Sequence, residues 1–327
     1  MNANLILQLS FLFLLLMNIT NCTPSSLFFS VISFFITCTL PNQVCSQAVD
    51  SNSIYIYDYN NQVRAGLRYM DTEVRFFPND NEVFTFQNST IGVSVGGAIG
   101  SFSINLGLPI ATLNGTINQG SNFDFDLRLF RKRYFWQVSG RRIAGFQTTD
   151  PIESFRPEIK LWDFTLFGFK VLDPRLSLKA AFKNSARQKS SSGSFLGGLY
   201  VNTQFLKTDS LEISDNTGFS IDSYFQVELG VGIGYAYTWV VSDKWYVTPV
   251  LIAGPEFRVL SYGLDGGEFT DQFRIAPRFR GNLAIGYNTS RFYASITAFL
   301  LPGLNTRNRL NTRTQDNQVR LRLGYRL

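Results

Sequence analysis

The sequence predicts an all-β protein: a single antiparallel transmembrane β-barrel of 12 to 14 strands. The first observation is composition, because charged residues make up 17% and aromatic residues 15% of the chain, whereas soluble domains average about 25% charged residues. The second is a mean hydropathy near zero, which does not fit a bundle of apolar helices of about 20 residues each. The third is a period-two alternation of apolar and polar residues in segment after segment, which is typical of strands with one face in an apolar medium.

The alternation is clearest in residues 225–239, where every odd-numbered residue is apolar or aromatic. A soluble sandwich would also bury one apolar face. The alternating segments, however, run 10 to 18 residues, longer than the usual strand of about five or six and long enough for the roughly 9–11 residues that cross hydrocarbon. Tyr and Trp lie toward segment ends, where an interfacial girdle is expected: Tyr134, Trp136, Trp239, Trp245, Tyr246, Tyr287 and Tyr293.

Thirteen segments are predicted as strands. Short turns at 99–100, 131–132 and 173–174 alternate with longer connections, as periplasmic turns alternate with external loops. This alternation breaks between 174 and 242, where three strands lie although two or four are required, so the expected number is 12 or 14. The predicted strands are 62–76, 87–98, 101–110, 122–130, 133–146, 158–172, 175–187, 194–207, 221–241, 244–260, 270–288, 291–301 and 317–327.

Residues 1–48 contain no Lys, Arg, Asp or Glu and are predicted to be an export leader. Their two apolar runs are each shorter than the roughly 20 residues that a spanning helix needs. Ser46 and Ala48 fit the small-residue pattern of a signal peptidase site. The sequence therefore predicts cleavage before Val49 and a mature barrel domain of residues 49–327.

Two features of the leader leave alternatives open. The usual positive n-region is missing, so both Met1 and Met17 remain candidate starts. All three cysteines lie within the first 45 residues, and acylation of Cys38 or Cys45 is one alternative to cleavage, as is a membrane-anchoring hairpin. If the leader is removed, the mature chain has no thiol, disulfide or cysteine metal site.

The chain contains no histidine. This excludes Ser-His-Asp and Cys-His nucleophile systems and histidine-ligated zinc. The excess of Lys and Arg over Asp and Glu, 30 against 24, is modest and lacks the concentrated patch of a nucleic-acid binder. The sequence therefore predicts a protein that is not an enzyme, needs no cofactor or metal, and binds no nucleic acid.

Charged residues on the polar faces of several strands would point into the lumen. Asp124 and Asp126 would lie about 6.5–7 Å apart at Cα, a spacing that suits Ca²⁺ binding or acid–base work. The favoured alternative is an ion pair with Arg128 and with lumen arginines of other strands. Pairing would give a plugged structural barrel, and unpaired arginines would give a hydrated basic channel. The candidate lumen charge cluster is Asp124, Asp126, Arg128, Glu228, Arg274, Arg278, Arg280, Arg320, Arg322 and Arg326.

Two further motifs have competing interpretations. The Gly230-Val-Gly-Ile-Gly234 segment has glycines at every second residue, which favours a strand over a nucleotide-binding loop. A candidate basic turn could cradle an anion through backbone amides, or it could be a flexible basic turn without a ligand. Its residues are Arg187, Lys189, Ser190 and Gly193.

Several stretches resemble an uncharacterised family of Bacteroidetes-type outer-membrane barrel proteins, catalogued as a domain of unknown function. The resemblance would span most of residues 55–327. It implies location and fold, and it supplies no activity. The residues that carry it are the Arg175–Phe182 and Arg187–Ser194 stretches, the Val63–Pro78 and Tyr134–Phe146 blocks, and the terminal Arg320–Leu327 segment.

These observations leave two leading hypotheses for function. The first is a non-enzymatic structural or surface barrel, exported to the outer membrane of a Gram-negative bacterium, with membrane lipid around it and a partner in the envelope machinery. The second is a narrow, anion-selective pore, because rings of arginine can select anions. A third, an enzyme, is disfavoured by the missing histidine.

Overall fold

The structure is a computed structural model of the whole chain. The predicted leader, and with it the cysteines and the candidate cleavage site, lie outside the described residues. The described residues are 55–59, 61–79, 82–112, 122–131, 133–148, 154–214, 219–264, 269–301 and 311–327.

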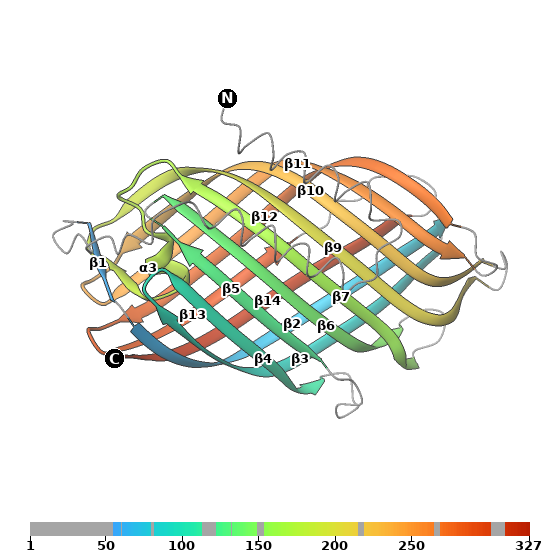
Figure 1. Cartoon of the computed structure of the whole chain (residues 1–327), viewed down its shortest axis with the longest axis horizontal. Coiled ribbons are helices and arrows are strands. Elements are labelled where there is room, and N and C mark those ends of the chain that lie inside the picture. Colours follow the sequence, from blue (N-terminus) through green and yellow to red (C-terminus); the bar gives the residue numbers. More distant parts are fainter. Residues whose placement is uncertain are drawn as a thin grey trace. The chain divides into compact units, whose positions relative to one another are not determined.

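Twelve antiparallel strands form a closed barrel (Figure 1). Each strand pairs with its neighbour in the chain, and β2 pairs with β14 to close the ring. This confirms the prediction of 12 to 14 strands, and the number in the structure is 12. The barrel strands are β2 (Asn61–Asn79), β3 (Glu82–Ile99), β4 (Phe102–Thr112), β5 (Phe123–Phe130), β6 (Tyr134–Thr148), β7 (Ser154–Val171), β9 (Ser192–Ser214), β10 (Phe219–Val240), β11 (Trp245–Leu264), β12 (Phe269–Asn288), β13 (Phe292–Leu301) and β14 (Asn311–Arg326).

The alternation in the sequence becomes an apolar exterior and a polar interior. In β10, Val231 is 52% and Ile233 78% exposed on the outside, whereas Gln226 and Glu228 are buried inside. Every backbone group of a closed barrel is paired, so only side chains meet the surroundings, and an exterior of this kind is stable in lipid. The fold is that of a barrel that spans a membrane with its strands. Among the described residues, no helix has the length and apolarity needed to cross one.

One predicted strand is wrong. Residues 175–187 do not join the barrel but fold inside it, as the short helix α3 (Leu178–Phe182) followed by β8 (Ala186–Gln188). The N-cap Ser177 accepts a hydrogen bond from the Ala180 amide and starts the helix. Apolar and polar residues alternate over a few positions of this stretch, as they do in a strand. Its removal from the strand count restores the alternation of short and long connections.

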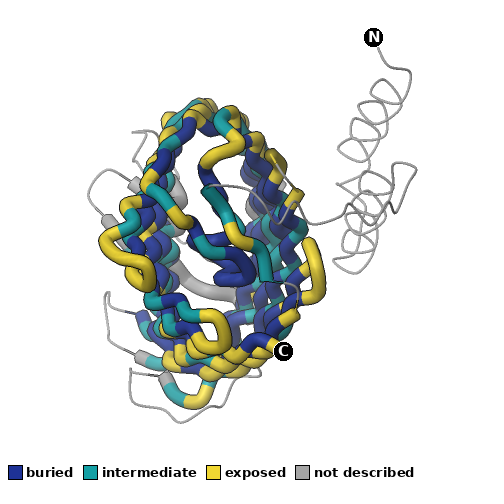
Figure 2. The backbone as a smooth tube through the Cα atoms, turned by 90° about the vertical axis from the view of Figure 1, so that its left-hand side faces the viewer, coloured by how far each residue is buried: buried dark blue, intermediate teal, exposed yellow. Residues whose placement is uncertain are grey.

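The internal segment closes one end of the barrel. Together with β1 (Ile56–Asp58), which pairs with β8, residues 173–191 form a unit that we call the plug. Figure 2, viewed along the barrel, shows this buried segment inside the ring of strands. The plug lies at the end with the short turns and the C-terminus (Figure 1), which corresponds to the periplasmic end of outer-membrane barrels.

The aromatic residues near the strand ends separate into two groups. Tyr134, Trp239 and Trp245 are 44–51% exposed on the outside, as expected for an interfacial girdle. Tyr246 and Tyr293 are only 5% and 2% exposed and face the lumen, so their assignment to the girdle is wrong. Tyr246 lies at an inward-facing position of β11, and Tyr293 lies at an inward-facing position of β13. The Tyr246 hydroxyl donates to the plug carbonyl of Ala181 at 3.2 Å.

Candidate functional site: the charged lumen

The lumen contains two apolar layers with charged residues between them. The first apolar layer packs the plug against the barrel, with Leu178 and Phe182 of α3 in contact with wall residues such as Phe135 and Phe299. The second lies on the other side of the charges, toward the long loops. Its members are Val74, Phe76, Phe86, Ile143, Phe146, Ile159, Leu161, Leu206, Tyr224 and Leu260.

The second apolar layer reaches across the lumen. The rings of Phe76 on β2 and Tyr224 on β10 have centroids 5.8 Å apart, although four strands separate β2 from β10 on the shorter path around the barrel. Phe86 packs edge-on against Phe76 at 5.6 Å. Aromatic contact between opposite walls leaves no room for a wide channel at this level.

Hydrogen bonds from several wall strands fasten the plug. The last carbonyls of a helix have no partner within it, and here wall side chains supply the donors. Arg128 of β5 donates to the Phe182 carbonyl at 3.1 Å, and Arg326 of β14 donates to the Asn184 carbonyl at 2.7 Å. Asn184 has a φ of 59°, a left-handed conformation that Asn tolerates and that reverses the chain after α3. Further wall donors or acceptors to the plug include Gln62, Tyr246, Ser192, Ser194, Asn288 and Ser295.

Asp126 is the centre of the first group of ion pairs. Its carboxylate accepts from Arg128 Nε at 2.7 Å and Nη2 at 2.5 Å on the same strand. It also accepts from Arg320 Nη1 at 3.0 Å, although β14 and β5 lie on different sides of the barrel. Asp124, two residues earlier, forms an ion pair with Arg68. The pairing with arginines expected for both carboxylates is confirmed, and this leaves neither carboxylate free for Ca²⁺ or for acid–base work.

Arg141 of β6 bridges the lumen. Its Nη2 donates to Asp163 on the adjacent strand β7 at 2.5 Å, and its Nη1 donates to Asp316 on β14 at 2.6 Å. Four strands separate β6 from β14, so this single guanidinium links opposite walls. Each of the three side chains is buried or nearly so.

Two glutamates and two arginines form a third group on β10, β11 and β12. Arg258 Nη2 lies 3.1 Å from Glu228 and 2.7 Å from Glu256, and Arg278 Nη1 lies 2.6 Å from Glu228 and also contacts Glu256. Both glutamates are buried. Each therefore has two cationic partners, which offsets the cost of removing a carboxylate from water.

The predicted lumen cluster is placed as follows. Asp124, Asp126, Arg128, Glu228, Arg278 and Arg320 take part in the ion pairs described above. Arg322 and Arg326 lie nearer the short-turn end of the barrel, against the plug. Arg274 lies on the inward face of β12, nearer the long loops. Arg280 lines the lumen. The charged residues that the prediction missed are Arg64, Arg68, Arg141, Asp163, Arg258, Glu256 and Asp316.

Three of the cations at the plug level have neutral partners. Arg64 donates to Ser103 Oγ at 2.6 Å, and Lys183 of the plug donates to the Gly100 carbonyl at 3.0 Å. Burial, followed by the nearby charges of Lys179 and Arg64, lowers the pKa of Lys183 to about 7. Arg326 stacks over the Tyr59 ring at 3.6 Å. Carbonyls and aromatic faces therefore replace carboxylates here.

The predicted basic turn spans the end of β8, a short connection and the start of β9. Arg187 belongs to β8 and pairs with Tyr57 of β1, and Gly193 belongs to β9. Between them, the Lys189 amide donates to the Tyr55 carbonyl at 2.7 Å, so its N–H is not available for an anion. Ser190 offers its carbonyl to Gln188 at 3.1 Å. Of the amides that an anion cradle would need, that of Lys189 is therefore taken up by backbone pairing within the plug.

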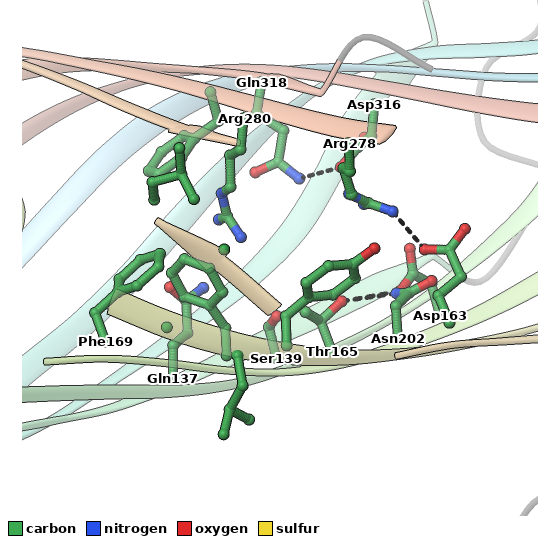
Figure 3. Close-up of a pocket in the computed structure, with 18 of the residues that line it drawn as sticks. Gln137, Ser139, Asp163, Thr165, Phe169, Asn202, Arg278, Arg280, Asp316 and Gln318 are labelled. Carbon is green, nitrogen blue, oxygen red and sulfur yellow. Dashed lines mark hydrogen bonds and ion pairs between the residues drawn. The ribbon is translucent and has the colours of Figure 1, made fainter. Parts of the chain in front are cut away.

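A cavity of about 130 Å³ lies among the ion pairs (Figure 3). Its polar wall includes Asp163, Asn202, Arg278 and Asp316, and its apolar wall contains the rings of Phe167, Phe169, Tyr200 and Phe299. Glycines of β10 help to make this space: a Cβ at Gly230 would collide with the Tyr200 ring, so the glycine-rich segment is an inward strand face and not a nucleotide loop. No group of three or more acidic, cysteine or histidine side chains suited to a metal occurs among the described residues.

Comparison with known proteins identifies a family. The model of a family described as a domain of unknown function (DUF4421) matches residues 48–327. The chain therefore belongs to this family of unknown function, and it has the closed barrel fold of outer-membrane proteins. No curated protein matches the sequence.

Three solved structures with a similar course of the chain are distant from it in sequence. The outer-membrane protease OmpT from Escherichia coli is 9% identical with a TM-score of 0.42, covering 85% of this chain and 100% of that one. The translocator domain of the autotransporter NalP from Neisseria meningitidis is 11% identical with a TM-score of 0.39, covering 82% and 89%. The COG4313 outer-membrane channel from Pseudomonas putida F1 is 9% identical with a TM-score of 0.32, covering 86% and 100%.

Proposed function

We propose that this protein is a closed, non-enzymatic barrel of the Gram-negative outer membrane, with a structural or surface role and a partner in the cell envelope. The observation that carries the proposal is the Arg141–Asp316 ion pair, which joins opposite walls at 2.6 Å. The plug on one side of it and the Phe76–Tyr224 contact on the other support the same conclusion. A lumen filled at three levels has no continuous water path.

An anion-selective pore is the competing function. The lumen residues named above include more cations than carboxylates, and an arginine-lined path favours anions. For such a pore to conduct, the plug, the Arg141–Asp316 ion pair and the aromatic layer would all have to move. Single-channel recording in planar bilayers separates the two functions.

We expect the wild-type barrel to insert into planar bilayers without producing conductance steps. A variant with Phe76→Ala and Tyr224→Ala should remain silent, because the plug still closes the other end. The same variant with residues 176–190 replaced by a short Gly-Ser linker and with Arg141→Ser should conduct, because the plug, the aromatic layer and the ion pair across the lumen are then all gone. Its conductance also shows that insertion can be detected. Conductance steps from the wild type, larger for chloride than for potassium, would establish the pore instead.

We also propose that the barrel reaches the membrane by export, with residues 1–48 removed. The proposal rests on the charge-free leader and on Ser46 and Ala48. Mass spectrometry of the protein from the membrane fraction should find a mature N-terminus near Val49 and no peptide that precedes it. Recovery of peptides containing Cys22 or Cys38 from the inserted barrel would contradict cleavage at this site.

A further inference from the structure

Arg280 differs from the other arginines around the cavity. It extends from β12 into the space shown in Figure 3, where its guanidinium lies 3.9 Å over the Phe167 ring. No hydrogen bond from Arg280 to a described residue is formed, and no described carboxylate lies within ion-pair distance of it. Its Nε is buried and has no acceptor.

Comparison with the other arginines that line the cavity shows that Arg280 is the exception in lacking a carboxylate partner. Four arginines line it, and three of them have carboxylate partners: Arg141 with Asp163 and Asp316, Arg278 with the two glutamates, and Arg320 with Asp126. Arg280 alone of the four has no counter-charge among the described residues. A guanidinium held away from bulk water without a counter-charge is costly, so the cavity should contain something that compensates it.

The polar atoms around the cavity favour an anion as the compensating group. Besides Arg280 Nε, two donors that line the cavity have no acceptor, the Tyr200 hydroxyl and Arg320 Nε. Among the residues that the structure describes, one cavity-lining acceptor, Asn202 Oδ1, is buried without a partner. A cavity with three unpaired donors and one unpaired acceptor suits an anion better than a cation.

The geometry of Arg280 also suits an anion. Stacking on Phe167 occupies one face of the guanidinium plane and leaves the N–H groups at its edge free to donate. A fork of donors in one plane binds a carboxylate or nitrate with two hydrogen bonds, and a halide with the same groups. A cavity of about 130 Å³ has room for such a small ion together with water.

We propose that the lumen cavity binds one small monovalent anion at Arg280. The anion completes the charge balance of the middle layer and stabilises the folded barrel. This inference goes beyond the proposed closed state, because it concerns occupancy of the cavity and not conduction. A barrel without conductance can lack the anion, and a conducting barrel can contain it. Anion binding and conduction are therefore tested by different measurements.

The first test measures the thermal unfolding midpoint of the detergent-solubilised barrel at constant ionic strength. Sodium chloride, bromide and formate are each compared with sodium gluconate, a bulky and strongly hydrated anion. We expect the midpoint to rise with the small anions, by about 3 °C when the free anion is about ten times its dissociation constant. The halide and formate arms show whether the site prefers a spherical ion or a planar one.

The variant Arg280→Gln should lose this anion response, and in gluconate it should be at least as stable as the wild type, because the uncompensated charge is gone. Arg280→Lys keeps the charge without the planar fork and should retain a weaker response. Arg156→Gln is the matched control, since Arg156 is an arginine with an exposed side chain, and it should respond as the wild type does. Equal responses of Arg280→Gln and wild type would overturn the proposal.

The second test places the ion directly. Crystals of the wild-type barrel grown in sodium bromide should show an anomalous scattering peak within hydrogen-bond distance of the Arg280 guanidinium, and crystals of Arg280→Gln should not. A cavity that holds only water, or a bromide bound at another lumen arginine instead, would refute the assignment to Arg280.

Discussion

An arginine introduced at Val231 should prevent the barrel from inserting into a membrane. Val231 lies on the lipid-facing side of β10, half exposed and within the apolar band. An Arg on the lipid face near the bilayer midplane costs roughly 2–4 kcal/mol, and the cost falls to about 0–1 kcal/mol near the interface. Leu127→Arg and Leu321→Arg should have the same effect for the same reason.

The readout is a heat-modifiability gel, in which a folded barrel and its boiled form migrate differently. Val231→Arg should show little or no folded species after reconstitution into lipid vesicles. Two controls test the cause: Val231→Thr, which is polar but uncharged and nearly the same shape, and Val241→Arg, which places the same charge beside the short turn at the end of that strand. If Val231→Arg and Val241→Arg inserted equally well, the outward assignment of this face would be wrong.

The sequence was sufficient to predict the barrel because alternation is a local property. Each strand shows its own two faces, so Val231 and Glu228 could be assigned to opposite sides without knowledge of their neighbours. The predicted strands end earlier than the real ones at the long-loop side, as in β9, which runs to Ser214, and β14, which begins at Asn311. Polar residues follow the loop ends of the strands, so the apolar alternation stops before the hydrogen-bonded ladder does.

The plug was not predictable by the same means. Residues 175–187 alternate over a short distance as a strand does, and only their place in the turn pattern indicated that one segment was miscounted. What distinguishes them is burial on all sides, with Leu176, Ala181 and Asn184 all buried. Such burial depends on the lumen that surrounds them and leaves no periodic signal in the sequence.

The ion-pair partners were only partly predictable. Asp126 and Arg128 share a strand face, so their contact follows from spacing. Arg141 and Asp316 lie on opposite walls, and their contact depends on the tilt and stagger of twelve strands. Glu256 was missed for another reason: β11 contains Pro249, Gly254 and Pro255, which blur the alternation that marks its inward face.

The neutral variant Asp126→Asn should lower the free energy of unfolding by about 3–5 kcal/mol. Its carboxylate is 3% exposed and accepts hydrogen bonds from Arg128 and Arg320. Loss of the negative charge would leave two guanidinium groups facing each other in the lumen, and breaking a buried ion pair costs this much because the remaining charges have no compensation. Urea unfolding of the barrel in lipid vesicles measures the difference.

Asp173→Asn is the matched control. Asp173 pairs with Arg175 at an exposed turn, with the side chains 26% and 57% exposed, and a solvated pair of this kind contributes about 0–1 kcal/mol. The double variant Asp126→Asn with Arg128→Gln should recover part of the loss, because it removes one of the two uncompensated charges. Together with the single variant Arg128→Gln, it completes a double-mutant cycle that gives the coupling between the two residues. If Asp126→Asn costs no more than Asp173→Asn, the lumen arginines are fully hydrated. The middle of the barrel would then be open to water, and the ion pairs would not be what closes it.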